Sequence, residues 1–249
     1  MRADALEIVE HNIALHGHHV YLVTAEASPR YAYSIGLTGK LGTELLLAGA
    51  IQFNAEEVRR IVNGVAEQLR HGVDAGSVIS LDTLGSFTLR GVHSGWIRLL
   101  MLGAVDYYKD REVVAYQILP DEAHWTIDIP ALNDEWSAPA NQPWKWLREG
   151  WPYEVPRSSV ATTNLRALKG GRITEAARWE EDEWELFAGS GPDVKPPDVR
   201  VVSLGALLGM DETLSAVVNL GVGQALWRDE SAGSWKRWGN EEPEAGMSG

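Results

Sequence analysis

The chain of 249 residues has no cysteine. It therefore forms no disulfide, offers no thiolate to a metal and has no thiol nucleophile. This composition is typical of a protein of the reducing cytoplasm. No apolar run approaches the roughly 18 residues of a membrane-spanning helix, and no basic segment followed by an apolar stretch opens the chain. We therefore expect a cytoplasmic protein with neither a membrane span nor a signal peptide.

Basic residues are also in short supply. Lys and Arg number 22 against 35 Asp and Glu, which gives a formal net charge of −13. Both parts of the chain share this excess: residues 1–150 carry 12 basic and 19 acidic residues, and residues 151–249 carry 10 and 16. The balance argues against a broad nucleic-acid-binding surface. The acidic surface keeps the chain soluble or, alternatively, faces a basic protein partner.

The motifs of several well-known chemistries are missing. The chain has no Gly-x-Ser-x-Gly elbow, and the segment 36–41 lacks the spacing and the Ser or Thr of a phosphate-binding loop. The densest histidine group, His11 with His16, His18 and His19, matches no defined metal-binding spacing. We interpret these residues as histidines at a helix end, next to the helix dipole. The sequence predicts neither a metal site nor a cofactor.

The most informative stretch runs from Tyr31 to Leu37 and reads Tyr-Ala-Tyr-Ser-Ile-Gly-Leu. Its aromatic and apolar residues follow a Ser-Pro turn signal and predict a strand. Gly36 within it indicates a bulge or the close approach of another backbone. Residues 38–42 predict a turn, and residues 44–50 a second apolar strand. Together they predict a β-hairpin.

The neighbouring segments alternate between helix and strand patterns. Helices are expected at residues 4–16, at 54–72 after a capping-box-like Asn54-x-x-Glu57, and at 95–108. Further strands are expected at 18–23, 87–92 and 113–119. This order predicts an α+β fold with a mixed or antiparallel sheet and packed helices.

Several of these features together resemble domain-of-unknown-function family 4262. They are the Tyr31–Leu37 run, the Glu44-Leu pair, Gly49, Asn63 with Gly72, Gln117, Pro120-Asp121 and Gln142-Pro143. The resemblance covers about residues 5–150 and implies a bacterial domain of unassigned biochemistry. One segment departs from the family pattern. Members often carry Gly-x-Phe-Pro-Trp after Pro-Asp, whereas residues 124–130 read His-Trp-Thr-Ile-Asp-Ile-Pro.

The character of the chain changes after Trp125. Ten of the eleven tryptophans lie between Trp125 and Trp238, and five of the eleven prolines lie within residues 129–157. This proline-rich stretch predicts an extended connector that covers a surface. It would join a domain of residues 1–150 to a smaller, Trp-rich α+β domain of residues 158–238. Residues 239–249 are acidic and Gly-rich and predict a disordered tail.

The second domain has a resemblance of its own. Residues 160–163 are expected to open this unit. Strands are expected at residues 184–189, 199–204 and 225–228, and Asp211 is expected to cap a short helix. The spacing of Trp184, Phe187 and Gly189, of Val201, Leu204 and Leu207, of Asp211 and Leu214, and of Gly223 and Arg228 resembles the immunity-protein-33-like domains. The resemblance implies a compact α+β module of the kind found among antitoxins of polymorphic toxin systems.

Two groups of side chains are candidate sites. Tyr31 and Tyr33 share one face of their strand, and their hydroxyls could converge with Glu44 and Gln117 on a polar pocket. The alternative is a buried Glu44 that tyrosine and backbone donors satisfy and that only specifies the fold. Asp121, in the loop with His124, suits acid–base chemistry or a simple turn. Candidate anchors for a protein partner are Trp179, Trp184, Trp227 and Trp235.

The sequence therefore predicts a non-enzymatic cytoplasmic protein that binds a basic surface of another protein, with toxin neutralisation as one such role. The alternative is a small-molecule enzyme or sensor that binds a small polar ligand in a pocket of Tyr33, Glu44, Gln117 and Asp121. Neither hypothesis involves nucleic acid or a membrane.

Overall fold

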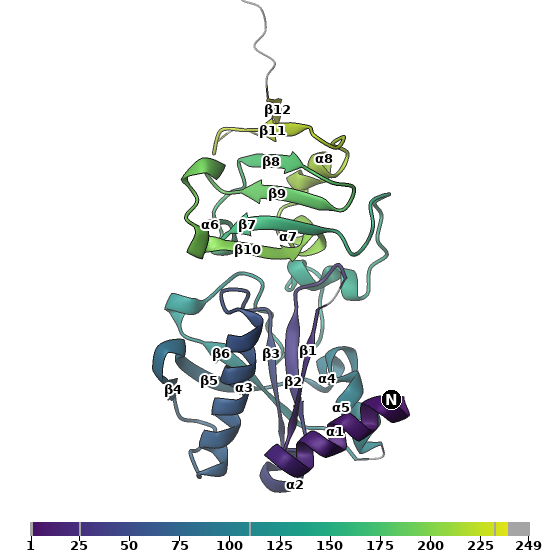
Figure 1. The fold of residues 1–249 in the computed structure, drawn as a ribbon, viewed down its shortest axis with the longest axis vertical. Coiled ribbons are helices and arrows are strands. Elements are labelled where there is room, and N and C mark those ends of the chain that lie inside the picture. The colour runs from purple at the N-terminus through teal and green to yellow at the C-terminus, as the bar shows by residue number, and fades with distance from the viewer. Residues whose placement is uncertain (1, 25, 110, 232, 239–249) are drawn as a thin grey trace, which may run out of the picture.

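The computed structural model describes residues 2–24, 26–109, 111–231 and 233–238, in which two six-stranded sheets are flanked by helices. The strands of sheet A run along the long axis of the molecule, and those of sheet B run across it (Figure 1). Each sheet contains parallel and antiparallel pairs, which confirms the expected α+β class. The tail predicted for residues 239–249 lies outside the described residues.

The elements have the following bounds. Sheet A contains, in spatial order, β1 (His19–Val23), β2 (Tyr31–Ile35), β3 (Glu44–Ala48), β6 (Ala115–Pro120), β5 (Gly85–Gly91) and β4 (Ile79–Leu81). Sheet B contains β10 (Val199–Ser203), β7 (Val160–Asn164), β9 (Glu183–Phe187), β8 (Glu175–Arg178), β11 (Ala225–Trp227) and β12 (Lys236–Arg237). The helices are α1 (Ala3–His16), α2 (Thr38–Leu41), α3 (Ala55–Arg70), α4 (Ser94–Leu100), α5 (Leu102–Tyr108), α6 (Leu165–Leu168), α7 (Leu204–Met210) and α8 (Ser215–Val218).

Helix α3 covers one face of sheet A and begins where the capping signal predicts. The side chain of Asn54 accepts hydrogen bonds from the backbone N–H groups of Glu56 and Glu57, and the carboxylate of Glu57 accepts one from the N–H of Asn54. The apolar face of α3 then packs against alternate residues of β2 and β3, among them Ala32 and Leu45. The predicted capping box and the predicted hairpin are both confirmed.

Helices α4 and α5 lie against the opposite face of sheet A. A single helix was expected at residues 95–108, and this prediction was wrong because the helix breaks at Met101. Met101 is fully buried, and its backbone leaves the helical region (φ −104°, ψ 41°). The break places Gly103 in the first turn of α5, where its N–H has no partner within the helix and donates to the hydroxyl of Tyr33 at 3.1 Å. Residues 38–41 likewise form one helical turn, α2, where a plain turn was expected.

Sheet B is covered on one face only. Helices α7 and α8 lie behind it in Figure 1, and the core between them contains Trp184, Leu186 and Leu207. The opposite face carries no α-helix among the described residues (Figure 1), although the 3₁₀ helix Gly191–Asp193 borders part of it. A sheet with one covered face exposes every second side chain of its strands to solvent or to a partner.

The two sheets touch along one edge of sheet B. The guanidinium of Arg200 in β10 donates to the carbonyls of Ile51 and Gln52 at 2.7 to 3.2 Å. At the start of α7, Gly205 lies so close to the backbone of Ala27 that a Cβ at this position would overlap the Ala27 carbonyl. Whether the two halves fold independently, within the expected bounds 1–150 and 158–238, stays a prediction.

Candidate functional site

Tyr31 and Tyr33 lie on the face of β2 that packs against α4 and α5. Their rings stack with 6.3 Å between centroids, and Tyr31 is 8% exposed and Tyr33 4% exposed. Burial raises the pKa of both hydroxyls, that of Tyr33 to about 12. This wall of the predicted polar pocket therefore faces the hydrophobic core rather than solvent.

Glu44 is fully buried at the start of β3, and its carboxylate is hydrogen-bonded on both oxygens. One oxygen accepts from the hydroxyl of Ser34 at 2.5 Å. The other accepts from the hydroxyl of Tyr108 at 2.5 Å, from the backbone N–H and hydroxyl of Thr38 at 2.8 Å each, and from the N–H of Gly36 at 3.2 Å. The alternative interpretation, a satisfied carboxylate that fixes the hairpin, describes this geometry. The tyrosine involved comes from α5 and was missed by sequence reasoning.

The side chain of Gln117 binds the backbone of the proline-rich connector and not a polar side chain of sheet A. Its side chain is 1% exposed, donates to the carbonyl of Pro130 at 2.8 Å and accepts from the N–H of Leu132 at 3.3 Å. A buried amide whose donor and acceptor are both engaged has little capacity left for a ligand. Gln117 therefore fixes the first part of the proline-rich stretch against the sheet.

Asp121 stabilises the loop that follows β6. Its carboxylate accepts from the N–H of Ser86 at 2.8 Å and pairs with Nδ1 of His124 at 2.6 Å. The hydrogen bond from Ser86, followed by those from His124, lowers the pKa of Asp121. The ring of His124 in turn stacks on Phe53 with 5.3 Å between centroids. The side chain of Asp121 is partly exposed and caps the 3₁₀ helix Glu122–His124.

Sheet A thus does not bring Tyr33, Glu44, Gln117 and Asp121 into one polar pocket, and that expectation is corrected. The physical reason is that each polar group has partners of its own, from α5, the hairpin, the connector, β5 and the segment after β6. A groove lies elsewhere, on the open face of sheet B.

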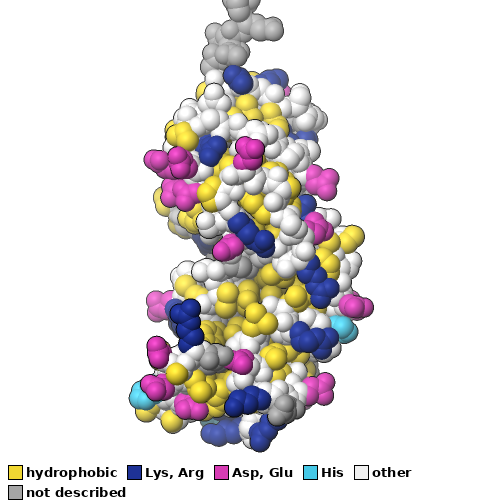
Figure 2. All heavy atoms as spheres, turned by 90° about the vertical axis from the view of Figure 1, so that its right-hand side faces the viewer, with side chains coloured by type: hydrophobic (Ala, Val, Ile, Leu, Met, Phe, Trp, Pro, Cys, Tyr) yellow, Lys and Arg dark blue, Asp and Glu magenta, His cyan; other side chains and the backbone are white. Residues whose placement is uncertain are grey.

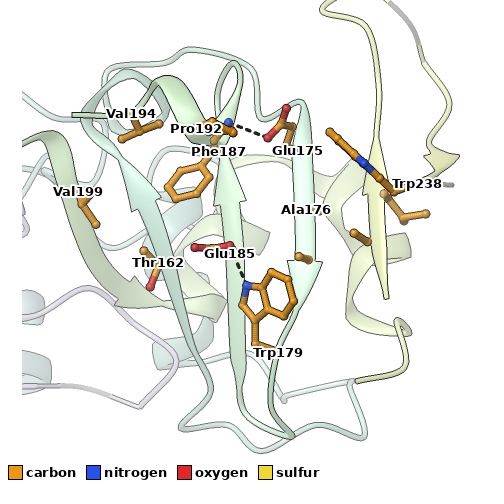
Figure 3. Close-up of a pocket in the computed structure, with 14 residues that line it drawn as sticks. Thr162, Glu175, Ala176, Trp179, Glu185, Phe187, Pro192, Val194, Val199 and Trp238 are labelled. Atoms are coloured by element: carbon orange, nitrogen blue, oxygen red, sulfur yellow. Dashed lines mark hydrogen bonds between the residues drawn. The ribbon is translucent and has the colours of Figure 1, made fainter. Parts of the chain in front are cut away.

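The groove has a volume of about 550 Å³ and crosses strands β7, β9, β8 and β11 (Figure 3). Because Trp184 in β9 points to the helices, its neighbour Glu185 points to the open face. The strand register then places Thr162, Ala177 and Ala225 in one row with Glu185. The two alanines keep the floor of the groove low, since their side chains end at Cβ.

Two exposed tryptophans line the groove beside this floor. Trp179, just after β8, is 54% exposed, and its indole N–H donates to the carboxylate of Glu185 at 2.7 Å (Figure 3). Trp238, just after β12, is 58% exposed, and its backbone N–H donates to the carbonyl of Ala225 at 3.1 Å. The indole of Trp179 is thus held by its own N–H, whereas at Trp238 the backbone is held.

A loop forms the third wall of the groove. The carboxylate of Glu175 in β8 accepts from the N–H of Gly191 at 2.7 Å. This bond ties the 3₁₀ helix Gly191–Asp193 to the sheet, so that Pro192 and Val194 lie beside the ring of Phe187 (Figure 3). The apolar wall is therefore held in place by a bond between a carboxylate and a backbone amide.

The groove combines aromatic rings with two carboxylates. Glu175 and Glu185 both line it, and each accepts a hydrogen bond from an uncharged donor. None of the described lining residues is Lys, Arg or His. Elsewhere the charges mix, as on the face shown in Figure 2, where acidic and basic side chains are interspersed. Aromatic faces next to carboxylates attract cations.

The four tryptophans predicted to anchor a partner have different positions. Trp179 lines the groove, as described above. Trp184 is 1% exposed in the core under sheet B, and the prediction is corrected for this residue because strand alternation turns it inward. The half-buried Trp227 lies under the ammonium of Lys236, and Trp235 under the guanidinium of Arg228. The sequence reasoning missed Trp238, although its place in a Trp-rich last segment was an available signal.

The described residues contain neither a metal-binding group nor a membrane-spanning helix. Among them, no group of three or more His, Asp or Glu side chains is placed to hold a metal ion. No helix in the described part of the chain is long and apolar enough to cross a membrane.

The comparisons with known proteins found similarity only in the part of the chain that forms sheet A. No curated protein and no solved structure showed significant similarity to the chain. A family model does match, and it ends before the first strand of sheet B begins. The resemblance of residues 158–238 to immunity-protein-33-like domains therefore stays a prediction. Residues 12–125 match the family described as domain of unknown function (DUF4262), which confirms the expected resemblance over this range, whereas Gln142-Pro143 lies outside the match.

Proposed function

We propose that this protein is a binding protein whose sheet B groove takes up a segment of another protein, with a Lys or Arg side chain between apolar residues. The observation that carries the proposal is the groove itself, in which Trp179, Trp238 and Phe187 surround two carboxylates without a basic residue among the described lining. This chemistry supports non-enzymatic recognition of a basic partner surface.

The geometry favours a cation and an apolar chain at the same time. A Lys or Arg head group gains from a Trp face within about 6 Å, and the nearby carboxylates of Glu175 and Glu185 add attraction. Its methylene stem and the flanking side chains can cover Ala177 and Ala225 on the floor. Trp179 is already oriented by Glu185, so that binding costs less side-chain entropy.

Two classes of partner protein carry this chemistry. A basic toxin neutralised in an immunity-type complex would satisfy it, and so would any cytoplasmic protein with an exposed basic segment. The alternative, a small-molecule enzyme or sensor built on Tyr33 and Glu44, has less support, because the polar groups of both residues are engaged inside the fold.

The proposal is tested with linear peptides. Peptides selected from a random library on the full chain should contain Lys or Arg, and a selected peptide should bind in a fluorescence anisotropy titration. Trp179→Ala and Glu185→Gln should each weaken this binding by about tenfold or more, since central aromatic anchors dominate such interfaces. Replacing the basic residue of the peptide by norleucine should weaken it similarly.

Two controls make the result specific. Trp125→Ala removes an indole that is 40% exposed and lies outside the groove, and it should leave peptide binding unchanged. A chain that ends at Trp238 should bind as the full chain does, because residues 239–249 contain three Glu and no basic residue to compete for the groove. Selected peptides without Lys or Arg, or equal binding to Trp179→Ala, would contradict the proposal.

A further inference from the structure

Strand β1 forms one edge of sheet A, and no described strand lies on its outer side (Figure 1). All five of its residues are half-buried, whereas every residue of β2 and β3 is buried. Among the described residues, the backbone of β1 makes its hydrogen bonds with β2 alone. Alternate N–H and C=O groups of β1 therefore point outward without a protein partner.

The other edges of the two sheets, as far as the structure describes them, carry features that prevent the pairing of strands. Strand β4 is three residues long, and β12 consists of Lys236 and Arg237, both exposed. Strand β10 lies next to sheet A, where Arg200 binds the backbone of Ile51 and Gln52. Strand β1 has none of these features, because its sequence His-Val-Tyr-Leu-Val contains no proline, no acidic residue and no Lys or Arg. Such an edge is a template for another strand.

The two faces of β1 are packed, so that the strand is fixed in the sheet and only its edge is open. Val20 and Leu22 pack against the hydrophobic cluster between sheet A and α3. Tyr21 and Val23 pack against the cluster on the opposite face, which contains residues of α4 and α5. A strand that is held in this way offers its outer backbone groups at fixed positions, and pairing then costs little conformational entropy.

A row of aromatic rings runs along β2 and ends in β1. The distances between ring centroids are 6.2 Å from Trp144 to Tyr31, 6.3 Å from Tyr31 to Tyr33 and 5.5 Å from Tyr33 to Tyr21. Aromatic pairs between neighbouring strands stabilise a sheet. The next ring of this row would belong to the strand that pairs with β1. In a second copy of the chain that ring is Tyr21 itself.

The sequence of β1 is complementary to itself. When all five residues overlap in an antiparallel pair, Tyr21 lies on the two-fold axis and faces Tyr21 of the second copy. Val20 then faces Leu22 of the second copy, and both are apolar. His19 faces Val23 of the second copy, and burial lowers the pKa of His19, which keeps the ring neutral at pH 7. Two chains of net charge −13 can therefore meet here without opposing like charges on the paired strands.

We propose that the protein forms a two-fold symmetric dimer in which β1 of each copy pairs antiparallel with β1 of the other. The two copies of the six-stranded sheet A then join edge to edge, and the outward backbone groups of β1 pair with one another. The interface lies apart from the groove on sheet B, since no residue of β1 lines that groove. Trp179→Ala should therefore dimerise as the wild-type chain does.

The mass of the full chain in solution tests the proposal. Light scattering should give about twice the 27.4 kDa of a single chain at high protein concentration. Tyr21→Lys places two like charges beside the axis and interrupts the row of rings, so it should weaken the dimer by about tenfold or more. Ser80→Lys adds the same charge at an exposed position of β4, on the opposite edge of the sheet, and should leave the dimer intact. A wild-type chain that is monomeric at every concentration, or a dimer that a folded Tyr21→Lys variant forms equally well, would overturn the proposal.

A cysteine scan covers the case in which Tyr21→Lys does not fold. Because the chain has no cysteine, a single introduced cysteine can form a disulfide only between two copies. Residues 19–23 are replaced one at a time, and the cross-link under mild oxidation should be strongest at the residue nearest the axis, where opposite Cβ atoms lie about 4.5–5.5 Å apart. Ser80→Cys is the matched control and should stay free of cross-links. A scan without a cross-link at any of the five positions, or with no more than at Ser80→Cys, would show that β1 does not pair with itself.

Discussion

Trp144 and Trp146 stand two residues apart in the 3₁₀ helix Gln142–Leu147 and enter two different hydrophobic cores. The indole of Trp144 donates to the carbonyl of Asp128 on the sheet A side at 2.7 Å. The indole of Trp146 donates to the carbonyl of Gly205 on the sheet B side at 2.8 Å. One short segment of the connector thus joins both sheets through buried aromatic side chains, 0% and 4% exposed.

Removing each indole should therefore destabilise a different part of the protein. We expect Trp144→Ala and Trp146→Ala to lower the free energy of unfolding by about 3–5 kcal/mol each, because both leave a large cavity and an unpaired carbonyl. Hydrogen exchange should show the loss of protection mainly in β2 and β3 for the first variant and in β7 and β9 for the second. Identical exchange patterns would show that the two cores do not open separately. Trp125→Ala, at a half-exposed site, is the control.

The buried carboxylate of Glu44 should be the most sensitive polar group of sheet A. Glu44→Gln places an amide N–H₂ where the carboxylate accepts from Ser34, Thr38 and Tyr108. We expect a loss of about 3 kcal/mol or more in the free energy of unfolding, measured with urea, because buried donors are left facing a donor. Thr38→Val removes one donor only and should cost less. Equal stability of Glu44→Gln and the wild-type chain would contradict this role.

The same network predicts a loss of stability in alkali. Burial, followed by the hydrogen bond and charge of Glu44, raises the pKa of Tyr108 from 10.0 to about 12. A group whose pKa is higher in the folded state stabilises the fold fully below its unfolded pKa, and this contribution is lost as the pH rises toward the folded value. The unfolding free energy should therefore fall between pH 10 and about 12. Tyr108→Phe should flatten this fall, whereas Tyr116→Phe, in β6 and not among the described partners of the Glu44 carboxylate, should not.

The hairpin and α3 were predictable from the sequence because their signals are local. Tyr31–Leu37 contains strand-forming residues next to a turn, and Asn54 with Glu57 matches the pattern of a capping box. The break at Met101 was not predictable, since the contact between Gly103 and Tyr33 that it allows joins distant segments. The local sequence of residues 95–108 predicts one continuous helix instead.

The candidate sites were predictable only in part, for the same reason. The alternation of Glu183, Trp184, Glu185 and Leu186 already indicates that Trp184 and its neighbours point to opposite faces. It does not indicate which face the helices cover, because that depends on where α7 and α8 pack. A cleft between the two sheets is lined by Arg30 and Asp128, which lie far apart in the sequence and come together only in the fold.

The close approach of α7 to sheet A makes Gly205 a sensitive position. Gly205→Ala would push a methyl group into the carbonyl of Ala27, a backbone atom with little freedom to move. We expect a loss of about 1–3 kcal/mol, seen as a lower melting temperature. The matched control is Gly39→Ala in α2, which has open space around it and should be neutral or stabilising by about 0.5–1 kcal/mol. If both variants behave alike, the contact between α7 and residue 27 does not matter for stability.

Arg228 should determine the stability of sheet B at neutral and at acid pH. Its guanidinium is 0% exposed and donates to the carbonyl of Ile173 at 2.7 Å, to the hydroxyl of Thr213 at 2.5 Å and to the carboxylate of Asp211 at 2.8 Å. Arg228→Lys cannot reproduce this planar set of bonds, and we expect it to cost about 3 kcal/mol or more in urea unfolding. Arg237→Lys, at an exposed position of β12, should cost little.

The pH dependence then identifies Asp211 as the partner that titrates. Burial acts to raise the pKa of Asp211, but the hydrogen bonds from Thr213 and Arg228 outweigh it and lower the pKa below 3.8. A lowered folded pKa means that the stabilisation is present above the unfolded pKa and is lost as the pH falls through the folded one. Urea unfolding from about pH 5 to about pH 2 should therefore show a smaller decline for Asp211→Asn than for the wild-type chain. Because Asp211→Asn removes the titrating group and keeps its size, an unchanged decline would mean that other carboxylates cause the acid instability of sheet B.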